Sequence, residues 1–387
     1  YEILEKRIGP SVRMLGSFIF LLLRLMWMAG IIYAVSSKVL VPMLGWSPSV
    51  IPYVCATLGL ITVLYTSLGG LRAVVVTDVI QTCILFGGAV LTLVIITVKM
   101  GGVGAWWPTT WSPDWDPFVI AYDTDARLTV MGCMTSVFAW YLCTASSDQV
   151  AVQRYLATRD APGARRVLLT SLCTDVMVGV FLGILGLALF AFFSSNTHMM
   201  AEGQHINANP DMLFPRFIVL AMPTGISGLV LAGLLAAAMS SLSSGVNSTC
   251  SVITTDFIDR LRGGASPETE QHHLQRVKGV AAVVGVIVVV LSIGVGQVSG
   301  NLLEVAYKVV NLLTAPLFML FFMAIFVRRP TPRATWMACI ASAIVAIGIA
   351  YGQWFGLSFI WIMPMALLTG ALVGILARGL GVGKRAG

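Results

Sequence analysis

Residues 277–299 read VKGVAAVVGVIVVVLSIGVGQVS, and no charged residue follows Lys278 in this run. A helix needs about 20 consecutive apolar residues to cross the ~30 Å hydrocarbon core of a bilayer. The run does not show the alternation of apolar and polar residues that is typical of an outer-membrane barrel strand. It therefore predicts a transmembrane helix.

The same kind of run recurs along the whole chain. Of the 387 residues, 57% are hydrophobic and 11% are charged, and the mean hydropathy is +0.89. Soluble domains carry about 25% charged residues, so this composition excludes an ordinary soluble protein. We predict an all-α polytopic membrane protein with one transmembrane domain over residues 1–387. Ten spans are expected, at approximately 11–37, 51–67, 73–98, 128–147, 166–194, 216–250, 277–299, 302–327, 334–352 and 357–377.

The basic residues divide unevenly between the two sets of loops. Ten spans make the loops alternate between the two sides of the membrane, and Lys and Arg are retained on the cytoplasmic side. Of the 24 basic residues, 18 fall in one set of loops, 4 in the other, and Arg24 and Lys308 lie within spans. Both ends of the chain are therefore predicted to be cytoplasmic, in the plasma membrane. The net charge of +7 indicates this topology and contact with anionic lipid, not a nucleic-acid surface.

Enzyme and metal motifs are not found in the sequence. All seven cysteines fall in apolar spans without a Cys-x-x-Cys pair, and the four histidines lie in loops. No phosphate-binding loop, nucleophile elbow or zinc motif occurs. We expect neither an enzyme nor an organic cofactor.

Small and hydroxyl residues recur at three- and four-residue spacing in the sixth predicted span. Ala237, Ser240, Ser241, Ser244 and Ser248 would share one face of a helix. Such a stripe allows two helices to approach closely, or it offers oxygen ligands to Na⁺. The spacing alone favours packing.

Asp78 is a carboxylate inside the third predicted span, with Gln81 three residues later on nearly the same face. An ionisable group at this depth needs a partner or a function. The sequence leaves open whether a neighbouring helix satisfies Asp78 or whether it lies in an ion path.

Arg24 lies near the middle of the first predicted span. A guanidinium there costs about 3 kcal/mol on insertion scales, so it should pair with a carboxylate or face an aqueous cavity. The favoured interpretation is a structural ion pair with Asp175 or Glu304. The alternative is a clamp for an anionic substrate.

Residues 146–154, SSDQVAVQR, follow the fourth predicted span and bring Asp148, Gln149, Gln153 and Arg154 together at its cytoplasmic rim. Ordinary loop polarity would explain this set. A network of this kind can also form a gate that breaks when an inward cavity opens.

Four motifs in order carry a family resemblance. They are YEILEKRIG at 1–9, YTSLGGLRAV at 65–74 with TDVIQ at 77–81, SDQVAVQRY at 147–155, and AAMSSLSS at 237–244 followed by Asn247 and Asp256. Together they resemble the sodium:solute symporter family of sodium-glucose, proline and pantothenate transporters. The resemblance implies the leucine-transporter fold, with two five-helix repeats of inverted topology and a midplane site beside a broken helix. It also implies about three further helices before Tyr1, so we expect the chain to lack the first helices of that fold.

The resemblance also assigns roles to residues. It implies a Na⁺ site at Ala237, Ser240 and Ser241, which replaces the packing interpretation, and a cation-access role for Asp78. Tyr141 is similar to an aromatic residue that gates sugar in the sugar branch, although Ala145–Ser147 changes the spacing. Arg24, Asp148 and Gln149 complete the expected substrate or gate residues.

We therefore expect a sodium-coupled secondary symporter that imports a small organic solute by alternating access. Arg24 favours an organic carboxylate as the solute. One alternative is a sugar or polyol symporter of the same family. Another is a symporter-like sensory domain of a membrane signalling protein.

Overall fold

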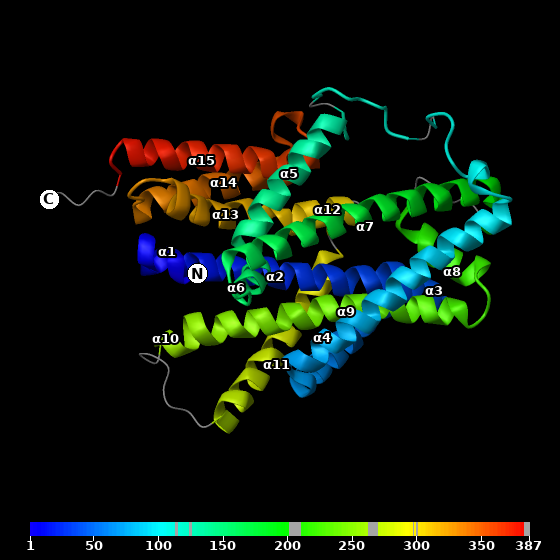
Figure 1. The fold of residues 1–387 in the computed structure, drawn as a ribbon, viewed down its shortest axis with the longest axis horizontal. Coiled ribbons are helices and arrows are strands. Elements are labelled where there is room, and N and C mark those ends of the chain that lie inside the picture. Colours follow the sequence, from blue (N-terminus) through cyan, green and yellow to red (C-terminus); the bar gives the residue numbers. More distant parts are fainter. Residues whose placement is uncertain are drawn as a thin grey trace.

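The computed structural model describes residues 1–112, 115–123, 126–200, 210–261, 270–296, 298 and 301–382, without the side chains of residues 65, 67–78, 261, 270, 271, 273 and 274. The regular secondary structure of the described chain is helical, without a strand, and an irregular segment precedes α5 (Figure 1). Its α-helices are α1 (Glu2–Arg7), α2 (Pro10–Ala34), α3 (Val41–Met43), α4 (Ile51–Met100), α5 (Val130–Ser147), α6 (Gln149–Leu156), α7 (Ala161–Ser195), α8 (Leu213–Ala221), α9 (Ile226–Val252), α10 (Asp259–Leu261), α11 (Glu270–Val295), α12 (Leu302–Val309), α13 (Asn311–Phe326), α14 (Pro332–Gly352) and α15 (Ile362–Gly379).

Two π-helices and several short 3₁₀-helices connect these elements. The π-helix η1 (Val35–Leu40) continues α2, and the π-helix η7 (Ile253–Ile258) continues α9. The 3₁₀-helices are η2 (Pro48–Val50), η3 (Val103–Ala105), η4 (Thr197–Met199), η6 (Pro210–Met212), η8 (Trp354–Gly356) and η9 (Phe359–Trp361).

Eight helical segments of the described chain are long and apolar enough to cross a membrane. Two of the ten predicted spans are outside this set. The span at 51–67 corresponds to a shorter apolar helix over Pro48–Leu64, and the span at 128–147 corresponds to α5. The eight segments are Pro10–Met43, Val79–Met100, Ala161–Ser195, Ile226–Ile258, Gln275–Val295, Leu302–Phe326, Pro332–Gly352 and Phe359–Gly379.

The predicted interruption between residues 67 and 73 is absent, because helical structure continues from Ile51 to Met100 as α4. A straight helix of 50 residues would be about 75 Å long, more than twice the hydrocarbon core. The two ends of α4 share α9 as a neighbour but differ in their other neighbours. Cys55 joins an apolar cluster with α2, α9 and α11, whereas Ala89 and Ile96 join one with α7, α8 and Val230 of α9. The two halves therefore pack in different surroundings although no helix end separates them.

Two other predicted spans are divided in the structure. The segment 216–250 is split between α8 and α9 by the turn at Met222–Gly225, where Gly225 adopts a φ of +92° that favours glycine. The segment 302–327 is split at Val310 into α12 and α13. Hydropathy does not predict either division, because apolar residues continue on both sides.

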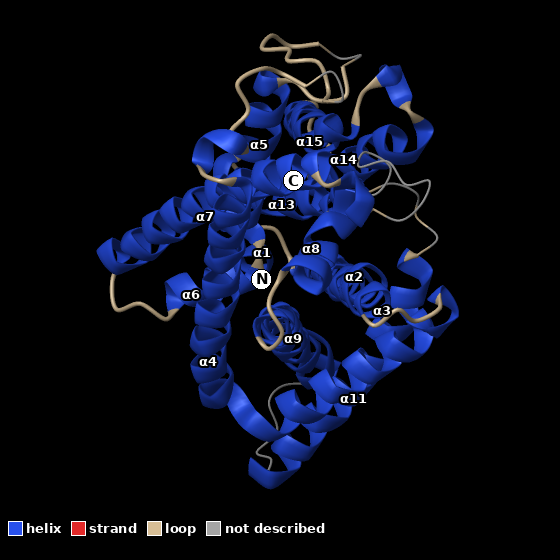
Figure 2. Ribbon diagram, turned by 90° about the vertical axis from the view of Figure 1, so that its right-hand side faces the viewer, coloured by secondary structure: helices blue, strands red, loops and turns tan. Residues whose placement is uncertain are grey.

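Helix α13 lies at the centre of the bundle, among α2, α5, α14 and α15 (Figure 2). Its side chains enter three apolar clusters. One is shared with α1 and α2, one with α5, α14 and α15, and one, through Ala315, with α14 and α15. Apolar contact on all sides is typical of a buried helix in a polytopic protein. This position makes α13 a rigid wall for the site described below.

Reciprocal glycine contacts join the first half of α4 to α11. A Cβ at Gly285 would lie 2.2 Å from Val63, and a Cβ at Gly59 would lie 2.3 Å from Val289. Each valine therefore fills the space left by a glycine on the opposite helix. Small residues that allow close backbone approach are a usual means of helix association in membranes.

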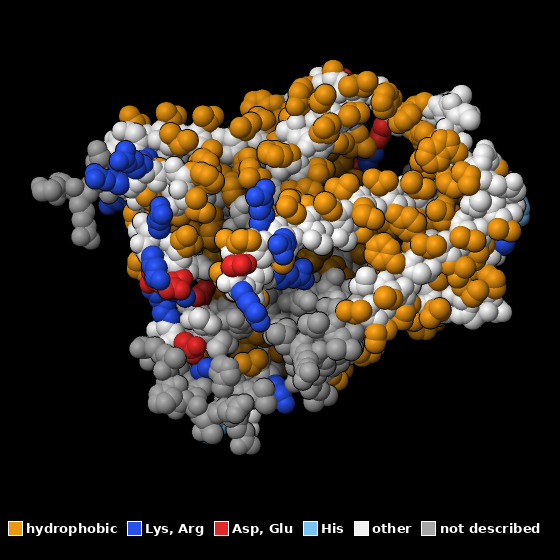
Figure 3. All heavy atoms as spheres, in the orientation of Figure 1, with side chains coloured by type: hydrophobic (Ala, Val, Ile, Leu, Met, Phe, Trp, Pro, Cys, Tyr) orange, Lys and Arg blue, Asp and Glu red, His pale blue; other side chains and the backbone are white. Residues whose placement is uncertain are grey.

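On the face seen in Figure 3, basic side chains lie at the end of the molecule with α1, α10 and the end of α15, and a second group lies nearer the middle, where Figure 1 places α6. At this end Arg13 contacts both Glu5 and Asp256, and Arg260 also contacts Glu5. The uneven distribution of charge predicted from the loops is therefore also a feature of the folded chain.

Candidate functional site

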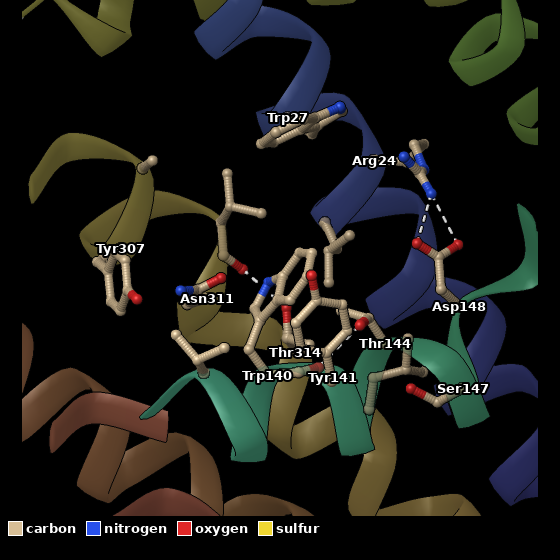
Figure 4. Close-up of a pocket in the computed structure, with 15 residues that line it drawn as sticks. Arg24, Trp27, Trp140, Tyr141, Thr144, Ser147, Asp148, Tyr307, Asn311 and Thr314 are labelled. Carbon is tan, nitrogen blue, oxygen red and sulfur yellow. Dashed lines mark hydrogen bonds and ion pairs between the residues drawn. The ribbon is translucent and has the colours of Figure 1, made fainter. Parts of the chain in front are cut away.

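A cavity of about 410 Å³ lies between α2, α5, α12 and α13 (Figure 4). Its wall is largely apolar and aromatic, with a few polar groups, as is usual for sites that bind small molecules. Arg24 and Asp148 are its only charged residues among those described. The lining residues are Leu23, Arg24, Trp27, Val137, Trp140, Tyr141, Thr144, Ser147, Asp148, Ala306, Tyr307, Val310, Asn311, Thr314 and Leu317.

Arg24 pairs with Asp148, not with Asp175 or Glu304 as the sequence suggested. Its Nη2 donates to both oxygens of Asp148, at 2.7 Å to Oδ1 and 2.6 Å to Oδ2. Asp175 is exposed on α7, and Glu304 pairs instead with Arg127, at 2.8 Å. The expectation of a carboxylate partner is confirmed and its identity is corrected. Arg24 and Asp148 are 124 residues apart in the sequence, and nothing in the sequence predicts that their side chains are in contact.

Asp148 lies where the chain breaks between α5 and α6. Its backbone is extended, with φ −73° and ψ 122°, and its Oδ1 accepts the N–H of Val150 at 2.9 Å. A carboxylate at a helix N-terminus satisfies an unpaired amide and interacts favourably with the helix dipole. Asp148 therefore caps α6 and faces the cavity at the same time.

The other two nitrogens of the Arg24 guanidinium, Nε and Nη1, do not contact a carboxylate in the described part of the chain. Its Nε is buried and has no hydrogen-bond partner, and Nη1 makes no hydrogen bond within the described part of the chain. The guanidinium lies 5.7 Å from the centre of the Phe20 ring, and the side chain is 11% exposed. A buried donor without a partner is costly. Arg24 lines the cavity, but Nε itself is enclosed by protein atoms, so an acceptor would reach this nitrogen only after neighbouring side chains move.

Arg13 on the same helix provides a contrast. Its Nε and Nη2 donate to Asp256, and its Nη1 donates to Glu5 at 2.7 Å. All three nitrogens are used by the protein itself. Arg13 therefore has the partners expected of a structural arginine, whereas Arg24 retains unused donors beside a cavity.

The sequence-predicted substrate and gate residues are only partly brought together. Tyr141 lines the cavity with Arg24 and Asp148, whereas Gln149 begins α6 and does not line it. Asn311 and Thr314 face the cavity from α13 and are not among the residues predicted from the sequence. A polar amide and a hydroxyl inside the span 302–327 were the available signal.

Ala237, Ser240 and Ser241 lie on consecutive turns of α9, as their spacing predicted. Ala237 and Ser240 are half-buried and Ser241 is exposed. The carbonyl of Ser240 accepts the hydroxyl of buried Ser243 at 2.9 Å. None of the three lines the cavity beside Arg24. Asp78 belongs to α4, but its side chain is outside the described part of the chain.

A site built from the usual metal-binding side chains is not found in the described part of the chain. It contains no group of three or more His, Cys, Asp or Glu that could hold a metal ion. A cation on α9 would depend on hydroxyl and carbonyl oxygens, which are hard ligands suited to an alkali ion.

Comparisons with known proteins agree with the resemblance found in the sequence. Residues 2–342 match the model of the sodium:solute symporter family. The sodium/sialic acid symporter SiaT of Proteus mirabilis is 31% identical over 366 residues, which are 91% of this chain and 70% of that protein. The sodium/sialic acid symporter NanT of Aliivibrio fischeri is 28% identical over 354 residues, which are 90% of this chain and 68% of that protein.

A solved structure has the same fold. It is described as the substrate-bound outward-open state of a Na⁺-coupled sialic acid symporter, and it matches with a TM-score of 0.80 and 28% identity. The match covers 98% of this chain and 76% of that one. It confirms the leucine-transporter-like fold expected from the resemblance, and the relatives are transporters, not enzymes. This multi-pass membrane protein belongs to the sodium:solute symporter family.

Proposed function

We propose that the protein is a Na⁺-coupled symporter that imports a small organic carboxylate, and that Arg24 binds the carboxylate in the cavity between α2, α5, α12 and α13. One observation carries the proposal: Arg24 is the basic residue that lines the cavity among those described, and its buried Nε has no hydrogen-bond partner. Carboxylates bind arginine through paired N–H groups. Two relatives named as sialic acid symporters, whose solute is a carboxylated sugar, support the same class of substrate.

The rest of the cavity suits the body of such a solute. Trp27, Trp140 and Tyr141 offer aromatic surface, and Asn311 and Thr314 offer polar groups on the wall formed by α13. Aromatic faces pack against sugar rings while polar side chains set their orientation. Tyr141 and Asp148 are the proposed gate residues of this cavity, and Gln149 is proposed to act beside them from the start of α6.

Na⁺ is proposed to bind at Ala237, Ser240 and Ser241 on α9, with Asp78 on its path. Na⁺ bound there would stabilise the conformation that accepts the solute, so that the two affinities are coupled. The basic end of the molecule is proposed to face the cytoplasm.

A neutral sugar is the second candidate, favoured by the aromatic lining. A sodium/mannose cotransporter of Bos taurus is 30% identical over 371 residues. The two candidates differ in the need for Arg24. A carboxylate requires its charge, whereas a neutral sugar needs only hydrogen bonds.

The test is uptake into proteoliposomes driven by a Na⁺ gradient, with sialic acid, its uncharged methyl ester and mannose as solutes. We expect Na⁺-dependent uptake of the acid, little uptake of the ester, and loss of acid uptake in Arg24→Gln. Arg24→Lys, which keeps the charge but loses the fork of donors, should recover only part of it. Na⁺-driven uptake of mannose with none of the acid would contradict the proposal.

A further inference from the structure

We propose that Asp148 occupies the anion-binding edge of Arg24 when the cavity is empty, so that the substrate carboxylate must displace Asp148 and thereby releases the junction between α5 and α6. This inference rests on the proposed function, because it assigns a competitor to the arginine that binds the solute. It makes Asp148 a positioning residue that links occupancy of the cavity to the state of α6.

The guanidinium of Arg24 offers two places at which a carboxylate can form paired hydrogen bonds. A carboxylate can bind it through two N–H groups either along the Nε and Nη2 edge or along the Nη1 and Nη2 end. Both arrangements use Nη2, and Nη2 is the atom that donates to both oxygens of Asp148. Nη2 carries one N–H directed toward each of these arrangements, and both oxygens of Asp148 lie within hydrogen-bond distance of it. A second carboxylate would therefore share Nη2 with Asp148, and the repulsion between two carboxylates at one nitrogen makes Asp148 a competitor for the two-point contact. Nε, which has no partner, is the second donor of one of the two arrangements.

Asp148 can lose its contact with Arg24 and still remain an ionised carboxylate. Its Oδ1 also accepts the N–H of Val150 at the start of α6. The N-terminus of a helix stabilises a negative charge through its free amides and its dipole. The displaced carboxylate therefore retains a partner, and the exchange at Arg24 replaces one carboxylate with another.

The pair of Arg24 with Asp148 differs from the pair of Arg13, also on α2, with Asp256. The Asp256 side chain is 6% exposed and is also held by Ser17, whereas the Asp148 side chain is 23% exposed and faces the cavity. Asp256 is enclosed and Asp148 is accessible. Only the second pair is placed where a solute can compete for its arginine.

The contact between Arg24 and Asp148 also holds the backbone at the junction of α5 and α6. Asp148 is the one extended residue between the end of α5 at Ser147 and the start of α6 at Gln149. In the empty state its contact with Arg24 fixes this junction to α2. When the contact is exchanged, α6 remains capped but is no longer attached to α2. Binding energy of the solute is thereby used to loosen one specific connection.

A test without solute uses hydrogen exchange measured by mass spectrometry on the full-length protein. Arg24→Gln should increase deuterium uptake of residues 149–156, because the junction loses its anchor on α2. Arg127→Gln, which removes a different arginine that pairs with Asp116 and Glu304, should leave this segment unchanged. Unchanged exchange of residues 149–156 in Arg24→Gln would overturn the inference, whatever the solute is.

A second test measures binding of sialic acid and its methyl ester in the presence of Na⁺. Asp148→Asn keeps a capping side chain but removes the competing charge, so affinity for the acid should rise roughly tenfold as the competing state is removed, while affinity for the ester stays the same. Na⁺-driven uptake by this variant should be slower. The control is Asp160→Asn, because Asp160 caps α7 through Gly163 at 2.8 Å and is outside the cavity; it should change neither affinity.

The outcomes separate the two proposals. Unchanged or weaker binding of the acid by folded Asp148→Asn would overturn the role of Asp148 while leaving Arg24 as the carboxylate site. Equal binding of acid and ester by the unmodified protein would instead overturn the carboxylate proposal and, with it, the displacement of Asp148 by a substrate carboxylate. The exchange measurement would then still show whether Arg24 anchors the junction between α5 and α6.

Discussion

Arg13 of α2 and Asp256 of η7 form a buried ion pair in which Nε and Nη2 of the arginine both donate to Oδ1 of the aspartate. The hydroxyl of Ser17, which is fully buried, donates to the other carboxylate oxygen. The pair thereby attaches the start of α2 to the π-helix that continues α9. Asp256 is among the few charged groups that the described core encloses, with an exposure of 4%.

Removal of one partner of this pair should destabilise the protein strongly. In Asp256→Leu the guanidinium of Arg13 and the hydroxyl of Ser17 lose their acceptor, and breaking a buried pair in this way costs about 3 kcal/mol or more. The matched control is Lys6→Gln, which breaks the exposed pair of Lys6 with Glu2 and should leave stability almost unchanged, because water screens the two charges. Thermal unfolding in detergent compares the two. Equal melting temperatures would contradict the structural role of Asp256.

Glu5 should make stability depend on acid pH. Hydrogen bonds from Arg260 and Arg13 lower the pKa of Glu5 below its ordinary value of 4.5. A carboxyl group whose pKa is lowered by folding contributes stability above its ordinary pKa, and the contribution disappears as the pH falls through the lowered value. Glu5→Gln should therefore melt below the unmodified protein at pH 7, and the two melting temperatures should converge below about pH 4. A constant difference from pH 7 to pH 3 would show that the charge of Glu5 is not involved.

Two glycines of α11 should respond differently to the same substitution. Gly285→Ala places a Cβ 2.2 Å from Val63, whereas nothing lies within 4 Å of a Cβ at Gly294. Overpacking of this kind costs about 1–3 kcal/mol, while alanine in an open helical position is neutral or slightly stabilising. We expect a lower melting temperature for Gly285→Ala only, with partial recovery in Gly285→Ala combined with Val63→Ala. Failure of the second change to restore stability would argue against the reciprocal packing of α4 and α11.

The proposed Na⁺ ligands can be tested through the ion dependence of uptake. In the full-length protein, Ser240→Ala with Ser241→Ala removes two hydroxyl oxygens, each worth about 1 kcal/mol. The Na⁺ concentration for half-maximal uptake should rise about tenfold or more. Ser248→Ala serves as the control, because the Ser248 hydroxyl donates within its own helix to Gly245, at 3.0 Å. An unchanged Na⁺ dependence at normal membrane abundance would leave the serine stripe with a packing role only.

The orientation in the membrane can be tested by labelling single cysteines in whole cells. A membrane-impermeant thiol reagent should reach Thr110→Cys, in the loop that precedes α5, and should not reach Arg159→Cys, in the basic connection between α6 and α7. Both positions are exposed, so access depends on the side of the membrane. Labelling of Arg159→Cys in intact cells would reverse the predicted topology.

The sequence identified the family and most helices because membrane spans follow directly from apolar length. Hydropathy does not show the divisions at Met222–Gly225 and Val310, because apolar residues continue on both sides of each. Pro223 and Gly225 were the available signal for the first division. Arg24 was identified because a charged side chain inside a membrane span is costly unless it has a partner. The predicted partner of Arg24 was wrong. Asp175 and Glu304 were chosen by residue type, whereas the actual pairing depends on how separate helices are rotated and how closely they approach. Asp148 was recognised as a rim residue, but its entry into the cavity follows from the break between α5 and α6.

The pairing of Arg24 with Asp148 also has an electrical consequence. These are the only charged residues that line the cavity in the described chain, and their charges cancel. Moving one elementary charge through a potential of 100 mV involves about 2.3 kcal/mol. If the empty cavity carried an unpaired guanidinium, the conformational change that reorients the cavity would move that positive charge through the membrane potential. The change would then cost energy that depends on the voltage. With the pair intact, these two residues add no voltage dependence to the return of the empty carrier.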